Sequence, residues 1–155
     1  MEIVDYVFRV DSSSKIGSGH LMRCLTLARA LRDVGALCSF ICRALEGNLN
    51  HLVVSEGFSL NELAHSRAGA KAAYEGEPYH SYWREVDWKI DAAETLSALS
   101  VLKPRWLVVD HYGLWYDWQV AVASGCKIMV IDDLADRHHH CDLLLDQNLS
   151  SDTLG

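Results

Sequence analysis

The chain reads Asp11-Ser-Ser-Ser-Lys-Ile-Gly-Ser-Gly-His20 between two apolar segments. The run before it, residues 3–10, is typical of a buried strand, and residues 21–34 repeat leucine and alanine at helical spacing. A glycine-rich turn between a strand and a helix is where α/β proteins bring their backbone close to a ligand. This stretch therefore predicts both an α/β fold and the place of a site.

Strands and helices are predicted to alternate along the remaining chain. Apolar runs and helical spacing indicate strands at 37–43, 58–63, 105–110, 127–132 and 142–146, and helices at 47–56, 87–102 and 114–124. Residues 64–78 are polar and alanine-rich, which indicates a surface loop or a marginal helix. Strands joined by helices imply one parallel sheet covered on both faces, so we expect a Rossmann-like α/β fold. The polar chain end indicates a domain over residues 1–150, with 151–155 as the start of a linker.

Composition excludes several classes of protein. The chain has 155 residues, of which half are hydrophobic and 23% charged, with a net charge of -7. This is globular composition, and the negative charge disfavours nucleic-acid binding. No apolar run reaches roughly 18 residues and no secretory pattern opens the chain, so we expect no membrane partner and a cytoplasmic protein. The five cysteines form no Cys-x-x-Cys pair and are interpreted as reduced thiols.

Polar residues follow four of the predicted strands. Ligands of open parallel sheets bind beyond the carboxyl ends of the strands, so these residues are candidates for one site. They are Asp11 to His20, Asp110-His111-Tyr112-Gly113, Asp132-Asp133 with the segment Asp136 to His140, and Asp146-Gln147-Asn148.

His20 is the candidate general base. Gly17 and Gly19 allow a sharp turn, and the first turn of a helix disfavours the imidazolium form. A neutral imidazole can take a proton from water, with Asp11 as a carboxylate that orients it. An isolated Gly-x-Gly-His is more often a solvated histidine near a helix cap. The whole string in its strand–helix setting favours a catalytic role.

Other motifs support weaker hypotheses. Met22 stands where a dinucleotide fingerprint needs its third glycine, so neither nicotinamide nor flavin is expected, and no phosphate loop of the Walker type is present. Asp110 and Tyr112 have two open interpretations, a functional one and one in which Asp110 caps the next helix and Tyr112 packs. The run from His138 to His140 with Cys141 fits no zinc pattern, which favours a polar loop with one structural histidine and no metal. The five tryptophans are interpreted as core or interface residues.

Three blocks of the sequence resemble, in order, the UDP-2,4-diacetamido-2,4,6-trideoxy-β-L-altropyranose hydrolases of pseudaminic acid biosynthesis. The first runs from Phe8 through His20 to Leu25, the second is Val109-Asp110-His111-Tyr112-Gly113, and the third runs from Ile131 to Arg137 and on from Cys141 to Asn148. Residues 64–86 contain no recognisable block of that family.

The resemblance implies a fold like that of GT-B glycosyltransferases, with this chain as the N-terminal half and an absent C-terminal domain that supplies most nucleotide contacts. It implies hydrolysis of a UDP-sugar at its anomeric carbon with inversion, needing no cofactor and no metal. His20 matches the histidine thought to activate water. The substrate-binding positions expected on this basis are Asp11, Ser12, Gly17, Ser18, Gly19, Arg23, Asp110, His111 and Tyr112.

Two other functions stay open from the sequence. A GT-B glycosyltransferase of polysaccharide biosynthesis would use the same cleft with an acceptor hydroxyl in place of water. A module without catalytic activity would bind a nucleotide sugar.

Overall fold

The protein is a three-layer α/β domain in the computed structural model, which describes residues 3–65 and 83–147. Six strands form one parallel sheet in the order β3-β2-β1-β4-β5-β6. Its elements are β1 (Tyr6–Val10), α1 (Gly19–Asp33), β2 (Cys38–Arg43), α2 (His51–Ser55), β3 (Ser59–Leu63), α3 (Trp88–Leu102), β4 (Trp106–Asp110), α4 (Tyr116–Val122), β5 (Lys127–Ile131) and β6 (Leu143–Leu145). This is the strand order of Rossmann folds, so the predicted fold class is confirmed.

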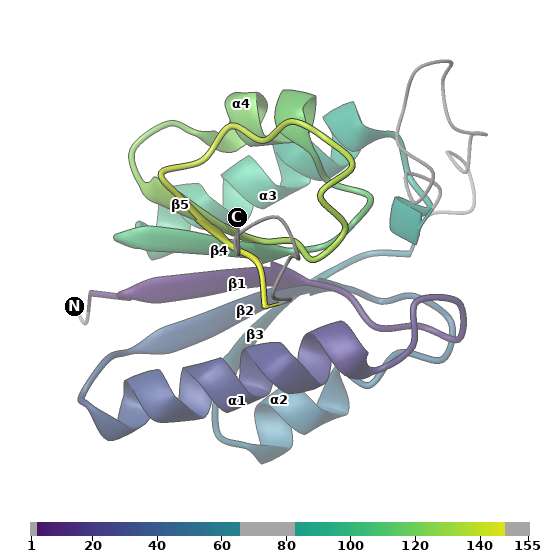
Figure 1. The fold of residues 1–155 in the computed structure, drawn as a ribbon. Coiled ribbons are helices and arrows are strands. Elements are labelled where there is room, and N and C mark those ends of the chain that lie inside the picture. Colours follow the sequence, from purple (N-terminus) through teal and green to yellow (C-terminus); the bar gives the residue numbers. More distant parts are fainter. Residues whose placement is uncertain (1–2, 66–82, 148–155) are drawn as a thin grey trace, which may run out of the picture.

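Helices cover both faces of the sheet. In Figure 1, α1 and α2 lie on one side of the strands and α3 and α4 on the other. The core is accordingly divided into two clusters. One joins Phe8 and Val10 of β1 to the buried residues of α1, and the other joins Val7 of β1 to α3 and α4.

The sequence explains where the elements begin and end. Val7 and Phe8 point to opposite faces because side chains alternate along a strand, and both are fully buried because helices cover both faces. Helix α1 is followed by Gly35 at φ +93°, and α3 begins after Asp87, whose carboxylate accepts a hydrogen bond from Lys89 N. Every predicted strand and helix is present, with shorter bounds at most ends. The predicted loop at 64–78 lies mostly outside the described residues.

The cysteines are free, as predicted. Cys24, Cys38 and Cys42 are buried and the remaining two are half-buried. Burial raises the pKa of the Cys24 thiol well above its ordinary value, and the nearby carboxylate of Asp110 adds to this effect. Such thiols are packing groups and not nucleophiles. Among the described residues, no helix is long and apolar enough to cross a membrane.

Candidate active site

His20 lies in the first turn of α1 and is held by a carboxylate. Its Nδ1 is 2.6 Å from Oδ1 of Asp110, the last residue of β4. A nitrogen this close to a carboxylate oxygen carries the proton and donates it, which leaves Nε2 as the acceptor of the ring. The structure gives no partner for Nε2 among the residues it describes. The side chain is 11% exposed, so the free nitrogen sits at the edge of the packed protein.

Arg23 clamps the same carboxylate. Its Nε is 2.5 Å from Asp110 Oδ2 and one of its terminal nitrogens is 2.6 Å from Oδ1, while the other lies 2.5 Å from Asp133. Burial would raise the pKa of Asp110, but the hydrogen bonds from Arg23 and His20 outweigh it, and the pKa lies below its ordinary value. Asp110 therefore remains ionised and available to His20.

Arg23 was expected to touch substrate, and the structure gives its guanidinium another role. The hydrogen bonds that Arg23 donates to Asp110, and then to Asp133, raise its pKa further, so it is a fixed cation. A direct contact between Arg23 and substrate stays a prediction.

Strand alternation explains why these groups meet. Val108 belongs to the core cluster on the α1 side, so Asp110, two residues later, points to the same side. His20, Arg23 and Cys24 stand three and four residues apart on α1 and share one face of that helix. Cys24 Sγ donates to Asp110 at 3.5 Å, so three side chains of one helix face converge on one carboxylate.

The predicted pairing of Asp11 with His20 is wrong. Asp11 follows Val7 and Arg9 in the alternation and points to the α3 side, away from α1. Its carboxylate accepts hydrogen bonds from Arg9 at 2.6 Å, from Arg43 N at 2.7 Å and from His111 Nε2 at 2.9 Å. Burial would raise the pKa of Asp11, but Arg9 and His111 lower it below the ordinary range. The residue is 1% exposed, and its direct contact with substrate stays a prediction.

Asp11 belongs to a buried charge network under the site. Arg9 and Arg43 both donate to Asp91 of α3, at 2.6 and 2.8 Å, and Trp118 Nε1 donates to the same carboxylate at 2.9 Å. Two arginines are thus balanced by two aspartates in the interior, as a buried charge requires. This network fixes the carboxyl ends of β1 and β2. Because Asp11 is also the first residue of the turn before His20, the network holds the start of that turn in place.

The turn itself is closed by its serines. Ser12 Oγ accepts a hydrogen bond from Leu49 N at 2.8 Å, and Ser13 Oγ accepts from Ile16 N at 2.9 Å. Gly17 has φ +82°, a conformation that side chains with a Cβ rarely adopt. Ser12 therefore holds the turn against the segment of Leu49, and its expected contact with substrate stays a prediction.

Ser18 and Gly19 form the exposed start of α1. The Ser18 hydroxyl makes no capping hydrogen bond, and a Cβ built on Gly19 would meet open space. The first-turn backbone N–H groups of a helix have no partners within the helix. Both residues thus lie where a ligand at the helix end would find them.

The two residues after Asp110 differ in role. His111 is buried: its Nε2 contacts Asp11, and its Nδ1 accepts from Gly113 N at 2.9 Å. Tyr112 is half-buried and places its ring at 90° to that of His20, with centroids 4.5 Å apart. Burial raises the pKa of Tyr112, so its hydroxyl stays protonated. Tyr112 thus lies beside the candidate base, and His111 holds the loop of Tyr112 against Asp11.

The histidine run after β5 holds one structural histidine, as predicted. His139 Nε2 lies 2.6 Å from Asp132, and its Nδ1 accepts from Gln119 of α4 at 2.9 Å. Within residues 3–65 and 83–147, no group of three or more histidine, cysteine or acidic side chains is arranged to hold a metal ion.

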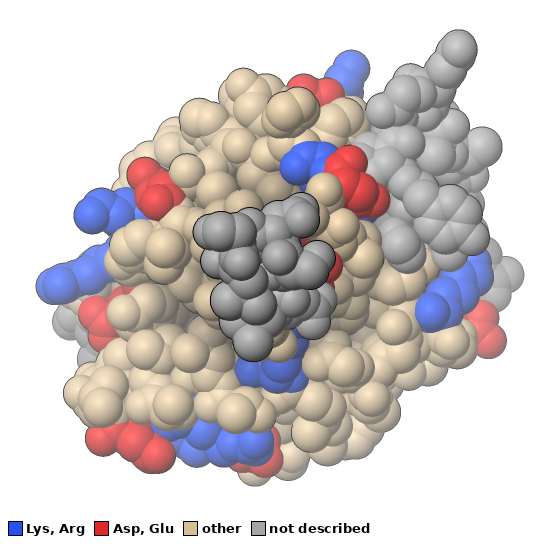
Figure 2. All heavy atoms as spheres, viewed as in Figure 1, with Lys and Arg blue, Asp and Glu red and all other residues tan. Residues whose placement is uncertain are grey.

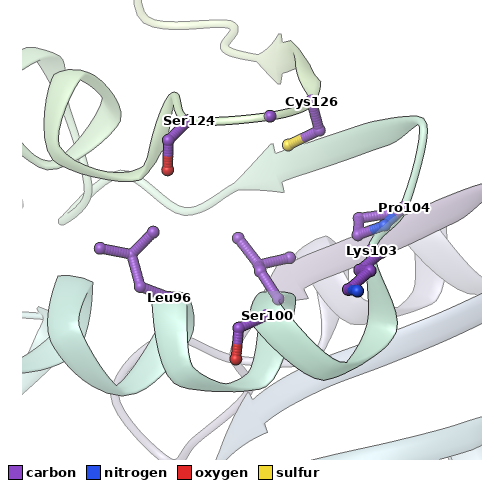
Figure 3. Close-up of a pocket in the computed structure, with 8 residues that line it drawn as sticks. Leu96, Ser100, Lys103, Pro104, Ser124 and Cys126 are labelled. Atoms are coloured by element: carbon purple, nitrogen blue, oxygen red, sulfur yellow. The ribbon is translucent and has the colours of Figure 1, made fainter.

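One pocket among the described residues lies away from His20. A pocket of about 580 Å³ lies between α3 and the turn before β5, at the amino ends of β4 and β5 (Figure 3). Leu96, Leu99 and Pro104 line it, and Cys126 there has its pKa raised by burial. It contains no paired acid and base.

On the face in Figure 2, described basic side chains are scattered among acidic ones and form no continuous basic patch.

Two residues near His20 were not placed beside it from the sequence: Asp133, which was named only as one of the polar residues at the sheet edge, and Trp83. Asp133 follows β5 and points to the α1 side because it continues the alternation of Met129 and Ile131. Trp83, interpreted as a core or interface residue, places its ring at 77° to that of His20, with centroids 5.8 Å apart. Alternation could have assigned Asp133 to the face of His20, whereas no sequence pattern places Trp83.

Comparison with known proteins identifies a relative of the chain. No family model matches the chain. The chain is 33% identical over 144 residues, 92% of its length, to the UDP-2,4-diacetamido-2,4,6-trideoxy-beta-L-altropyranose hydrolase of Campylobacter jejuni subsp. jejuni serotype O:2. The match spans 41% of that protein's length. The predicted resemblance is confirmed, and the chain is a homologue of this hydrolase over nearly its whole length.

Proposed function

We propose that His20 is the general base in the hydrolysis of a UDP-sugar at its anomeric carbon. The observation that carries this proposal is the 2.6 Å pairing of His20 Nδ1 with Asp110, which leaves Nε2 to accept a proton. The name of the C. jejuni relative supplies the substrate class. The products are UDP and a free 2,4-diacetamido-trideoxy sugar, used in pseudaminic acid biosynthesis.

The chemical step needs one base and a correctly placed water, because UDP is already a good leaving group. UDP leaves with the electron pair of the bond to the anomeric carbon, and water forms the new bond from the opposite face, so the configuration inverts. His20 Nε2 takes the proton from this water, and Asp110 stabilises the imidazolium that forms. Holding the water, the base and the carbon in line supplies much of the acceleration.

The start of α1 is suited to the leaving group. Its free backbone N–H groups and the positive end of the helix dipole favour an anion such as a diphosphate. In this proposal the turn from Gly17 to Gly19 binds the phosphate end of the substrate, and Tyr112 lies against the sugar. His20 stands in the first turn of the same helix, so the base and the phosphate site share one helix end.

Residues 1–150 are proposed to be the N-terminal half of a GT-B-like enzyme. The chain matches 41% of the length of the C. jejuni hydrolase, which leaves room for a second domain that holds most of the nucleotide. Complete activity is therefore expected of a protein in which this chain is joined to such a domain.

The test is UDP release by the full-length protein in the absence of any acceptor. We expect UDP to form, and NMR to detect the inverted anomer as the first sugar released. Strict dependence on an acceptor would instead identify a glycosyltransferase, and release of the retained anomer would contradict attack opposite UDP. An intact protein whose biological activity survives His20→Ala would point to a non-catalytic binding module.

A further inference from the structure

Two aromatic rings stand beside the candidate base. The rings of Trp83 and Tyr112 are stacked, with an interplanar angle of 23° and centroids 5.6 Å apart. Both present themselves at a steep angle to the ring of His20, at 5.8 and 4.5 Å. The base therefore has a wall of two stacked rings on one side, and we call this pair the aromatic wall.

The segment that carries Trp83 is fastened in place. Arg84 is 4% exposed, and its guanidinium donates to the carbonyl oxygens of Val86 at 2.9 Å and Gly113 at 3.3 Å. Glu85, at φ +56°, accepts from Lys15 Nζ at 3.0 Å, which ties the segment to the turn before His20. A buried arginine and a bridge to the catalytic turn fix the position of Trp83.

The loop that carries Tyr112 also packs closely against the segment of Trp83. A Cβ added to Gly113 would lie 2.9 Å from the ring of His111 and 3.1 Å from Arg84 N. Glycine is thus needed for the loop after β4 and the segment of Trp83 to pack together. Three separate chain segments, which carry Trp83, Tyr112 and His20, are therefore held as one unit.

We propose that Trp83 contacts the apolar face of the sugar and determines a preference for deoxy sugars; this rests on the proposed function. A water between His20 Nε2 and the anomeric carbon places that carbon within about 6 Å of the base, at one hydrogen-bond length plus one near-attack distance. Both rings of the aromatic wall have their centroids within 5.8 Å of the His20 ring, so the sugar ring lies against them.

The chemistry of the aromatic wall selects among sugars. Aromatic faces pack against C–H groups and methyl groups, whereas a hydroxyl placed there loses its hydrogen bonds to water. A 6-deoxy sugar with acetamido groups presents several methyl groups to such a wall. Because discrimination by an apolar surface reaches at most about 10²-fold, the preference over a 6-hydroxy sugar is expected to be moderate.

The experiment compares two substrates on the full-length protein. One is the UDP-2,4-diacetamido-2,4,6-trideoxy sugar and the other is the matching UDP-sugar with a 6-hydroxyl. We expect Trp83→Leu to raise KM for the deoxy sugar about 10-fold with kcat within about 3-fold, and to narrow the preference over the 6-hydroxy sugar. Trp83→Phe keeps an aromatic face, so it should retain most of the affinity for the deoxy sugar and most of the preference over the 6-hydroxy sugar.

Trp106→Leu is the matched control. Trp106 is also half-buried but opens β4 at the opposite edge of the sheet, where Lys127 Nζ lies 5.5 Å from its ring. We expect it to change thermal stability and leave KM and the substrate preference unchanged. If Trp83→Leu lowers stability as Trp106→Leu does and leaves KM and preference unchanged, Trp83 is structural and the inference is wrong. If the wild-type protein releases no UDP from either sugar, the proposed function itself has failed.

Discussion

The two faces of the sheet use the same residue types at its carboxyl edge in different ways. On the α1 side, His20 pairs with Asp110 at 2.6 Å. On the side of α3 and α4, His139 pairs with Asp132 at the same distance, and His111 pairs with Asp11 at 2.9 Å. A histidine–aspartate pair therefore does not by itself identify the base.

The second ring nitrogen separates these pairs. Gln119 donates to His139 and the backbone of Gly113 donates to His111, so both rings are fully used in holding loops together. His20 has its second nitrogen open at the protein edge, next to a half-buried tyrosine. The α1 side therefore offers an open imidazole nitrogen, whereas the histidines of the other side use both of their nitrogens in packing.

The largest expected effect comes from changing His20, and it tests the difference between the two faces directly. His20→Gln removes the proton acceptor, and we expect kcat for UDP release to fall about 10³-fold, within the range that general bases contribute. His139→Gln, the same change on the other face, should leave kcat within about 3-fold. Steady-state UDP release by the full-length protein measures both. Equal losses in the two variants would show that the open nitrogen of His20 is irrelevant.

Asp110→Asn is expected to have a smaller effect. The amide no longer holds the proton on Nδ1 as a carboxylate does, so kcat should fall about 10²-fold, the low end of what a base contributes. Asp110 acts through His20, so the double variant His20→Gln/Asp110→Asn should be no slower than His20→Gln alone. Additive losses in the double variant would mean that Asp110 contacts substrate itself.

Much of this arrangement could be predicted from the sequence. The alternating apolar runs specify the order of strands and helices, and the rule for parallel sheets places the polar residues at one edge. The prediction that Asp11 orients His20 is wrong because a carboxylate near a histidine in the sequence can point to the other face of the sheet. Alternation along β1 and β4 assigns Asp11 to the α3 face and Asp110 to the α1 face.

Other parts could not be predicted in this way. The packing of Trp83 against Tyr112 depends on Arg84 reaching the backbone of Gly113, a contact across 29 residues that no local pattern encodes. The unused pocket between α3 and β5 is likewise a product of tertiary packing. The position of His20 at the sheet edge was therefore more predictable than the side chains that pack around it.

The smallest expected effect concerns stability on the α3 and α4 side. In Asp132→Asn, the new amide N–H faces the Nε2–H of His139. The His139 ring cannot move its proton to Nδ1, because Gln119 donates to that nitrogen. Gln119 is fixed in this orientation, since its side-chain oxygen accepts from His140 N at 2.7 Å. Two donors then oppose each other, which costs about 1 to 3 kcal/mol of unfolding free energy. Urea unfolding at pH 7 measures this loss, and Asp117→Asn on the exposed start of α4 is a control with the same charge change.

The pH dependence of that loss gives its cause. Burial would raise the pKa of Asp132, but the hydrogen bond from His139 and the other nearby groups lower it below the ordinary value. A carboxylate with a lowered folded pKa stabilises the fold above its unfolded pKa, about 3.9, and this stabilisation is lost as pH falls through the folded pKa. The stability difference between wild type and Asp132→Asn should therefore be largest near neutral pH and shrink below about pH 4. A difference that stays constant down to pH 3 would mean that the ionised carboxylate does not hold His139, and the contrast between the two faces would then rest on His20 alone.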